Sequence, residues 1–521
     1  MSFSTSAHSL PERFGLILAA LLQKPGLPFA DVLPEEDIQA AFDEEGAVFG
    51  QDDDAVFTPA LTLWACLSQV LFKAEGRSCA AAVSRVIVLL VALGRKACSD
   101  NTSAYCRARA KMPERAICRV TLQVADRCEL EVPDDWRWKE RRTHLVDGFT
   151  VSMPDTPENQ AAYPQSNSQK EGIGFPLARL VVMLSLATGM ARALAIGPYS
   201  GKETGETALL RQLLDRLCEG DVVVADRYFC SYFMICLLLE RGVDIVSRLH
   251  QKRTADFRRG KSLGPGDHLV DWQRPPRPDW MDEATYARMP ASISIREIEI
   301  TVPQPGSRVE VFVVVTTLLD ADKYTREDVA ELYRERWLAE LDIRAVKCSL
   351  GMDVLRCKSP EMVRKEIWTC MLAYNLVRQT MLQAAYASGR SPRDLEDDRA
   401  KVEKTCPVTA EPSCSPGSLD GARAKAGEAC RAASEDACLP REISFTAAMQ
   451  KLAASWVGAP CFNEAMCDEL RRANHKHLPK HRVRNRPNRV EPRAIKRRPK
   501  PHKLLTKPRA QARADLLAGK T

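Results

Sequence analysis

The stretch THLVDGFTVSM at residues 143–153 is the first of several short runs rich in apolar and β-branched residues. The next two lie within ARLVVMLSLATGMARALAIGPY at 178–199, and a further run is DVVVADRYF at 221–229. Before the last of these, GETALLRQLLDRLCEG at 205–220 repeats its apolar residues at helical spacing. The pattern therefore predicts the order strand, strand, strand, helix, strand.

This order is the one expected of a ribonuclease-H-like core, an α/β fold in which helices flank a mixed sheet. Two strong strands, SISIREIEITV and RVEVFVVVTTLL, follow a stretch that contains Gly, Pro and Trp, and they indicate a β-rich insertion at 246–322. Helical spacing resumes at TREDVAELYRERW. We therefore expect a catalytic core in two parts, 121–245 and 323–387, interrupted by this insertion.

Other segments precede and follow this core. Helical periodicity in 57–120 predicts an all-helical N-terminal domain, either a DNA-binding module or a structural packing unit. An acidic segment at 1–56 precedes it. Residues 388–440 are rich in Pro, Ser, Gly and charge, which predicts a flexible surface excursion. A C-terminal helix is expected at 441–470.

The formal charge of +7 hides an asymmetry between the tail and the rest of the chain. Residues 471–521 contain 18 Lys or Arg against two acidic residues, which is +16, so the remainder of the chain sums to −9. Prolines interrupt this tail, and we expect an extended arm that binds the phosphates of nucleic acid. A solvated solubility tail is the alternative. The candidate phosphate-binding residues are Arg493, Lys496, Arg497 and Arg498.

Cysteine usage and hydropathy argue against a secreted or membrane protein. The 18 cysteines are scattered through a long chain, and no basic leader precedes the apolar patch FGLILAALL. The apolar run VSRVIVLLVALG is too short to cross a bilayer. We expect reduced thiols, no membrane association and a cytoplasmic protein that joins the nucleoid when it binds DNA.

The stretch LYRERWLAELDIRAVK at 332–347 places four polar side chains on one side of an expected helix. At 100° per residue, these four project within about 60° of one another. They are Tyr333, Arg336, Glu340 and Lys347. An exposed ion pair between residues four positions apart is the structural alternative for the charged members of this group.

Two of the expected strands carry acidic residues. Asp147 interrupts HLVDGFTV and Asp226 ends VVVAD, and a carboxylate in a buried strand costs free energy unless something compensates it. Together with Glu340, these residues offer hard oxygen ligands for Mg²⁺ or Mn²⁺. Two such ions activate a water or a 3′-hydroxyl and stabilise the leaving oxygen of a phosphodiester. The other polar residues of the helix would then hold DNA phosphates.

The spacing Y-x2-R-x3-E-x6-K, met by the four residues of this helix, resembles the signature of bacterial insertion-sequence transposases of the DDE class. Other segments, such as VVVADRYFCSYFMICLLLERGVDIVSRL and LRCKSPEMVRKEIWTCMLAYNLVR, are similar to family segments in the family order. The resemblance covers most of residues 60–390 and the tail.

The resemblance implies a catalytic triad of Asp147, Asp226 and Glu340 with two Mg²⁺ or Mn²⁺ ions. It also implies a homodimer that pairs the inverted-repeat ends of its own element, cuts them and joins them to target DNA. In the family, a tryptophan of the insertion stacks on a base flipped from the DNA end, a role for Trp272 or Trp280 unless both are core residues. The alternatives are a metal-dependent nuclease of the same fold and a DNA-binding regulator without turnover.

Overall fold

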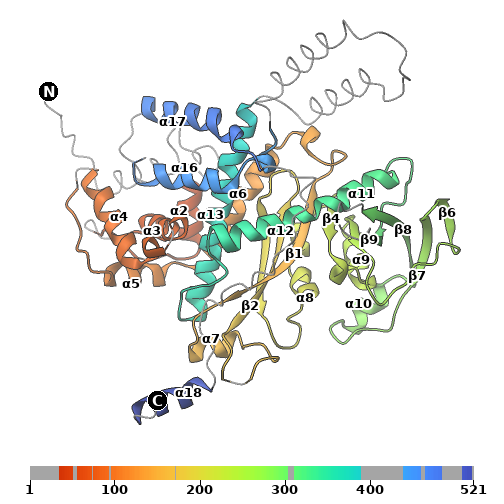
Figure 1. The fold of residues 1–521 in the computed structure, drawn as a ribbon, viewed down its shortest axis with the longest axis horizontal. Helices are drawn as coiled ribbons and strands as arrows, with labels where there is room; N and C mark the ends of the chain where they lie inside the picture. Colours follow the sequence, from red (N-terminus) through yellow and green to blue (C-terminus); the bar gives the residue numbers. More distant parts are fainter. Residues whose placement is uncertain are drawn as a thin grey trace, which may run out of the picture. The chain divides into compact units, whose positions relative to one another are not determined.

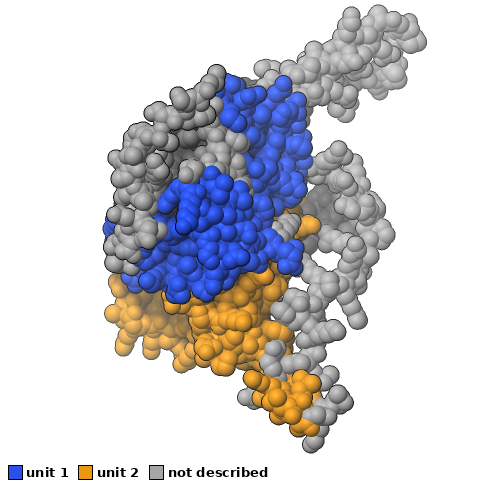
Figure 2. All heavy atoms as spheres, turned by 90° about the vertical axis from the view of Figure 1, so that its left-hand side faces the viewer, with its two compact units in different colours: residues 1–140, 187–189, 372–484 blue, residues 141–186, 190–371, 485–521 orange. Residues whose placement is uncertain are grey.

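The structure is a computed structural model of the 521-residue chain. It describes residues 35–47, 49–50, 55–72, 74–92, 95–170, 172–302, 310–388, 438–458, 464–483 and 507–518. The chain divides into two compact units, which Figure 2 colours separately. The first comprises 1–140, 187–189 and 372–484, and the second comprises 141–186, 190–371 and 485–521.

The first unit is helical. Its helices are α2 (Glu35–Glu44), α3 (Pro59–Leu71), α4 (Cys79–Ala92), α5 (Ser103–Lys111), α6 (Glu114–Leu130), the second half of α13 (Pro360–Ala387), α16 (Phe445–Gly458) and α17 (Glu464–His477). The Asn375 side chain of α13 donates to the Thr121 carbonyl of α6 at 3.0 Å, which ties late and early helices of this unit together. The helices expected in 57–120 are present, but α6 continues past the predicted boundary at 120.

The second unit is built on a nine-stranded mixed sheet of order β3-β2-β1-β4-β5-β9-β8-β7-β6 (Figure 1). The strands are β1 (Thr143–Ser152), β2 (Leu177–Ser185), β3 (Ala191–Pro198), β4 (Val222–Ala225), β5 (Asp244–Arg248), β6 (Lys261–Gly264), β7 (Asp267–Gln273), β8 (Ser292–Val302) and β9 (Glu310–Thr316). β4 is parallel to both β1 and β5, and all other neighbours are antiparallel. The predicted order of three strands, a helix and a strand is confirmed.

Helices flank this sheet. They are α7 (Pro157–Ala162), α8 (Glu206–Arg211), α9 (Tyr232–Leu239), α10 (Glu283–Arg288), α11 (Arg326–Glu335), α12 (Trp337–Arg344) and the first half of α13, and α18 (Arg509–Leu517) also belongs to this unit. On one face, Val146 of β1 packs in a core with Leu209 and Leu210 of α8. α12 contacts β1, and both α9 and α11 contact β5.

Strands between β5 and α11 occupy the range predicted for a β-rich insertion. β8 and β9 are the two strong strands expected there. β9 pairs with β5 through Ser247 and Val315, so these strands extend the central sheet instead of forming a separate one. The backbone hydrogen bonds between β5 and β9 join these strands to the core, and no residue pattern in the sequence predicts this pairing.

Two predicted helices are interrupted. The helix expected at 205–220 ends at Arg211 and is followed by a 3₁₀ turn at Leu214–Arg216. The helix expected at 332–347 is divided at Arg336 into α11 and α12, and its last turn, Ala345–Ser349, is a π-helix. A wider turn rotates the residues that follow it, so the wheel argument holds only as far as the end of α12.

The C-terminal predictions need correction where the structure describes the chain. The single helix expected at 441–470 is two helices, α16 and α17. α17 runs to His477, and Leu478 and Pro479 are buried after it, so the first part of the predicted arm is folded. Most of the 388–440 excursion lies outside the described residues, as do all four predicted phosphate-binding residues, Arg493, Lys496, Arg497 and Arg498. No described helix is both long and apolar enough to cross a membrane.

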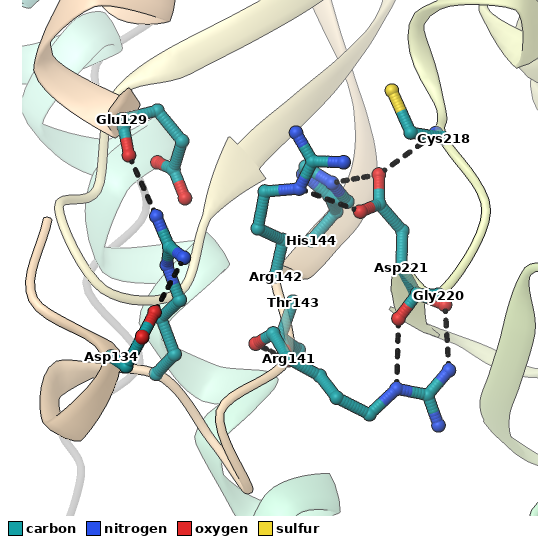
Figure 3. Close-up of polar contacts among 10 residues, drawn as sticks. Glu129, Asp134, Arg141, Arg142, Thr143, His144, Cys218, Gly220 and Asp221 are labelled. Atoms are coloured by element: carbon teal, nitrogen blue, oxygen red, sulfur yellow. Dashed lines mark hydrogen bonds and ion pairs between the residues drawn. The ribbon is translucent and has the colours of Figure 1, made fainter. Parts of the chain in front are cut away.

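A buried polar cluster joins the starts of β1 and β4 (Figure 3). The Asp221 carboxylate contacts His144 Nε2 at 2.9 Å and Arg142 Nε at 2.9 Å, and it accepts from the Cys218 amide at 3.0 Å. Burial opposes ionisation of Asp221, but the hydrogen bond and charge of His144, the Cys218 amide and Arg142 outweigh it and lower its pKa. The charged carboxylate is therefore well compensated and holds the two strands together.

This cluster fixes the strand register that matters for the site. Thr143 pairs with Val222, and the parallel ladder runs to Val146 opposite Ala225. Asp147 is the next residue of β1, and Asp226 directly follows the end of β4. Two acids far apart in the chain are thus brought to adjoining positions.

Replacing Asp221 by Ala should destabilise the second unit, because His144, Arg142 and the Cys218 amide lose a buried partner. We expect the free energy of unfolding to fall by about 3–5 kcal/mol, the usual cost of breaking a buried ion pair. Urea denaturation followed by circular dichroism measures this loss. Asp215→Ala, which removes a carboxylate that is 93% exposed, is the control and should have little effect. Equal stability of the two variants would contradict the role of the cluster.

Candidate active site

The candidate site lies where β4 ends beside β1. The ladder between the two strands stops at Val146 and Ala225, so β1 has no β4 partner from Asp147 onward. After β4 and Asp226, the chain forms a 3₁₀ turn, Arg227–Phe229. The Ser247 hydroxyl donates to the Asp226 carbonyl at 3.0 Å. Asp147 and Asp226 therefore lie at adjoining positions where the pairing of β1 with β4 ends, and this point is called the opening below.

The surroundings of Asp147 disfavour its ionised form. Burial raises its pKa from 3.8 to about 6. The Gly148 amide, which donates to Asp147 Oδ1 at 2.8 Å, and the Arg336 guanidinium lower the pKa, whereas the carboxylates of Glu206 and Glu340 raise it. A positive charge near Asp147 would therefore be stabilising.

The residues of α11 and α12 contribute three of the four predicted side chains to this opening. Arg336 donates to Glu340 Oε1 at 2.9 Å, and its charge also acts on Asp147. Tyr333 is buried, with its ring 5.4 Å from that of Phe312. Burial raises the pKa of Tyr333 to about 12, so the phenol keeps its proton at neutral pH.

Lys347 has a different place from the one that the helical wheel predicts. It lies on the π turn, and its Nζ donates to the Thr150 carbonyl of β1 at 3.0 Å. The ammonium is also 6.0 Å from the centroid of the Phe149 ring. Lys347 therefore ties this turn to the strand that carries Asp147.

The sequence analysis missed a fourth acidic residue, Glu206 at the start of α8. Its carboxyl carbon lies 2.5 Å from the position that a Cβ on Gly148 would occupy. Burial raises the pKa of Glu206, Arg179 lowers it, and the Asp226 carboxylate raises it. The one signal in the sequence is the glycine directly after Asp147, since glycine inside a strand often marks a close approach.

Neither predicted tryptophan offers a bare ring face. Trp272 is 5% exposed, its Nε1 donates to Glu297 at 3.0 Å, and the Arg253 guanidinium lies 3.8 Å from its ring centroid. Trp280 is half-buried, with the Arg211 guanidinium 3.8 Å from its ring centroid. This packing argues against the base-stacking role predicted for Trp272. The ring is buried and its indole N–H has a buried partner, as in a core residue.

Two exposed aromatic residues lie next to the acids in the chain. Tyr228 is 56% exposed, two positions after Asp226, and Trp337 is 50% exposed, three positions before Glu340. Exposed rings of this size are uncommon among the described residues of this chain.

The donor set fits a hard divalent cation in chemistry. Carboxylate oxygens are the preferred ligands of Mg²⁺ and Mn²⁺, and the repulsion among Asp147, Glu206 and Glu340 favours an added positive charge. Within the described residues, however, no group of three His, Cys, Asp or Glu side chains is arranged so that it could hold a metal ion. Arg336 supplies the positive charge in this structure and engages Glu340.

One protein-family model matches the part of the chain that carries these residues. Residues 138–376 match the family model of the transposase DDE domain. The matched range begins just before β1 and ends within α13, so it includes Asp147, Glu206, Asp226 and Glu340.

Several curated proteins resemble the chain around the DDE domain. The transposase InsG of insertion sequence element IS4 from Escherichia coli K12 is 27% identical over 300 residues, which is 56% of this chain and 64% of that protein. The putative transposase InsL of IS186A, from the same strain, is 40% identical over 65 residues, or 12% of this chain and 18% of that protein. The chain thus spans less than two thirds of the length of either relative.

A solved structure also matches in part. The piggyBac transposase in a synaptic complex with hairpin DNA, determined by cryo-electron microscopy, aligns with 78% of this chain and 88% of that chain. The TM-score is 0.40 and the sequence identity is 10%.

The raised pKa of Asp147 makes a prediction about stability and pH. Since its pKa of about 6 exceeds its ordinary value of 3.8, ionised Asp147 destabilises the folded state increasingly as the pH rises through this interval. In the presence of a chelator, Asp147→Asn should be more stable than the unsubstituted protein near pH 8, by up to about 3 kcal/mol. The difference should vanish near pH 4. Denaturant titrations at both pH values test this, and a variant that is less stable near pH 8 would contradict it.

Proposed function

We propose that this protein is a DNA transposase that cuts the ends of an insertion sequence and joins them to target DNA by metal-dependent phosphoryl transfer. The proposal is supported by the adjoining positions of Asp147 and Asp226 at the end of the β1–β4 ladder, by the electrostatic effect of Glu340 on Asp147, and by the match of residues 138–376 to the transposase DDE domain. The names of the curated relatives support the same activity.

The sheet topology supports a ribonuclease-H-like catalytic core. The first five strands follow the order β3-β2-β1-β4-β5, in which β1 is antiparallel to β2 and parallel to β4. The strands β6 to β9 then form the β-rich insertion between the second and third catalytic acids. Residues 57–120 form a helical, DNA-binding domain in this proposal.

Asp147, Asp226 and Glu340 would hold the divalent ions, two Mg²⁺ or Mn²⁺. When bound, such ions lower the pKa of an attacking hydroxyl and neutralise the leaving oxygen. In this proposal Glu340 exchanges Arg336 for the ion, and the guanidinium then takes a phosphate oxygen. This single exchange makes Glu340 available to the ion and Arg336 available to the DNA.

Three other side chains position the DNA in this proposal. Arg336 makes bidentate contacts to a phosphate next to the scissile bond. Tyr333 keeps its proton and donates a hydrogen bond. Lys347 holds the π turn against β1 and adds a point charge near the strand that carries Asp147.

DNA binding outside the active site completes the proposal. The basic arm, through Arg493, Lys496, Arg497 and Arg498, contacts phosphates without reading sequence. A homodimer pairs the two inverted-repeat ends. In this proposal an unstacked base at the DNA end stacks on Tyr228 or Trp337, the exposed rings near Asp226 and Glu340 in the sequence, or on the part of Trp280 that Arg211 leaves exposed.

Changing Asp147, Asp226 or Glu340 singly to Ala should lower cleavage by on the order of a thousand-fold or more, because each removes a cation ligand. DNA binding should change little. The assay incubates purified protein and Mg²⁺ with DNA that carries the candidate ends from beside the gene. Glu331→Ala, which removes an exposed acid of α11, is the matched control and should keep activity.

The products of this assay also decide between the classes of activity. Strand joining together with cleavage is the result that we expect of a transposase. Cleavage without joining would instead indicate a nuclease, and a bound complex without chemistry would indicate a regulator. A Glu340→Ala protein that cuts as well as the unsubstituted one would contradict the assignment of the third acid.

The basic arm makes a prediction about salt. Replacing Arg493, Lys496, Arg497 and Arg498 together by Gln should weaken DNA binding, because four phosphate contacts no longer release counterions. The slope of log affinity against log salt concentration should become shallower by about 3–4. Fluorescence anisotropy over a salt series measures this slope. A solubility tail would leave the slope unchanged.

A further inference from the structure

We propose that Arg227, Lys252 and Arg253 form a second phosphate-binding site beside the candidate active site. It lies on the β5 side of Asp226, and it holds the DNA backbone a few nucleotides from the scissile bond. This inference rests on the proposed function, since it names the path of the cut DNA strand beyond the predicted acids. None of the three residues is among the predicted DNA-binding residues.

The ends of two neighbouring strands bring these residues together. β4 pairs in parallel with β5, so both strands end at the same edge of the sheet. Arg227 begins the 3₁₀ turn after Asp226, and this turn contacts β5. Beyond β5 the chain turns at His250, whose carbonyl accepts from the Arg253 amide at 2.8 Å and whose Nδ1 accepts from the Lys252 amide at 3.2 Å.

The Arg227 guanidinium is the first argument for an anion. Within the described part of the chain, this half-buried side chain makes no hydrogen bond, ion pair or ring contact. Its Nε is buried without a partner, whereas its two terminal nitrogens remain accessible. A buried polar nitrogen without a partner costs free energy, and a guanidinium fork fits phosphate oxygens. The structure thus leaves this cation unsatisfied and open to an anion.

The second argument is that like charges gather around His250. Burial lowers the pKa of His250, and the charges of Lys252, Arg253 and Arg227 lower it further. Among the described groups that shift this pKa, none is a carboxylate. Three cations therefore act on one imidazole from two segments of the chain, and their mutual repulsion favours an added negative charge.

The third argument is the contrast with the far end of the same segment. Arg258 Nε lies 2.9 Å from Asp256 Oδ1, and Arg259 Nε lies 3.4 Å from Oδ2, so one carboxylate serves both arginines. Arg253 instead lies over Trp272, with 3.8 Å between the guanidinium carbon and the ring centroid. Stacking of this kind leaves the in-plane N–H groups of a guanidinium to other acceptors. The uncompensated charge is thus at the end of the segment next to β5.

The spacing of the strands gives the distance from the predicted acids. Neighbouring strands lie about 5 Å apart, so the end of β5 is about 10 Å from β1. A DNA strand advances about 3.4 Å per nucleotide along its helix axis. A strand whose scissile phosphate lies between Asp147 and Asp226 can therefore place a phosphate about one to three nucleotides away over the end of β5.

Binding of the full-length protein to a labelled duplex that carries a candidate element end tests this proposal. Fluorescence anisotropy over a salt series measures the slope of log affinity against log salt concentration. Arg227→Gln and Lys252→Gln should each make the slope shallower by about 1, and the double variant by about 2, because each removes a phosphate contact. Arg258→Gln is the matched control, since Asp256 already pairs with that charge, and its slope should not change.

Neutral methylphosphonates, placed one at a time along the duplex, locate the contact. Neutralising the contacted phosphate should weaken binding by the unsubstituted protein and weaken binding by Arg227→Gln no further. This phosphate should lie about one to three nucleotides from the cleavage site. Equal losses for both proteins at every position would overturn the inference.

The outcomes also separate this inference from the proposed function. Unchanged slopes in both single variants, with cutting and joining intact, overturn the inference and leave the proposed function standing. Shallower slopes in a protein that does not cut DNA support the phosphate site and contradict the proposed function. Arg227→Lys keeps the charge and should keep most of the slope, which a purely structural role of the side chain would not require. Lys252 is exposed, so its variant decides if Arg227→Gln fails to fold by circular dichroism.

Discussion

The parallel pairing of β1 with β4 is the constraint on which the candidate site depends. The buried contacts of Asp221 with His144 and Arg142 hold the first residues of both strands together. The ladder then carries this alignment to Val146 and Ala225. Asp147 and Asp226, which directly follow these two positions, are therefore neighbours. A shift of the register by one residue would turn one of them to the other face of the sheet.

The carboxylates near the ends of these strands repel one another. Burial and neighbouring carboxylates raise the pKa of Asp147, and the charge of Arg336 offsets part of this penalty. Such an arrangement lowers the stability of the folded protein, and carboxylates with strongly perturbed pKa values cluster at functional sites. It is suited to a site that receives cations and phosphates in turn, since each arriving charge finds an opposite charge that is poorly satisfied.

Much of the fold and part of the site could be predicted from the sequence, because local patterns specify them. Apolar runs predicted β1 to β4 and both long strands of the insertion, and the acids in HLVDGFTV and VVVAD stood out against their apolar neighbours. Long-range pairing was not predictable in the same way. Nothing in the sequence indicates that β9 pairs with β5, or that the chain widens into a π turn before Lys347.

Side-chain environments were the least predictable part of the site. Trp272 reads as an available aromatic ring until its N–H is seen to bond Glu297 and its face to lie against Arg253. Glu206 reads as an ordinary residue near the start of a helix until its distance from Gly148 is known. In both cases the decisive neighbour is remote in sequence, so no local pattern contains the information.

The central claim is that Asp147 and Asp226 share a divalent cation at the end of β4. Anomalous diffraction from crystals soaked in Mn²⁺ tests it most directly, because the signal locates the metal itself. The account predicts an anomalous peak within ligand distance of both carboxylates. Crystals in which Mn²⁺ binds elsewhere, or in which these two carboxylates contact no metal at saturating concentration, would contradict it.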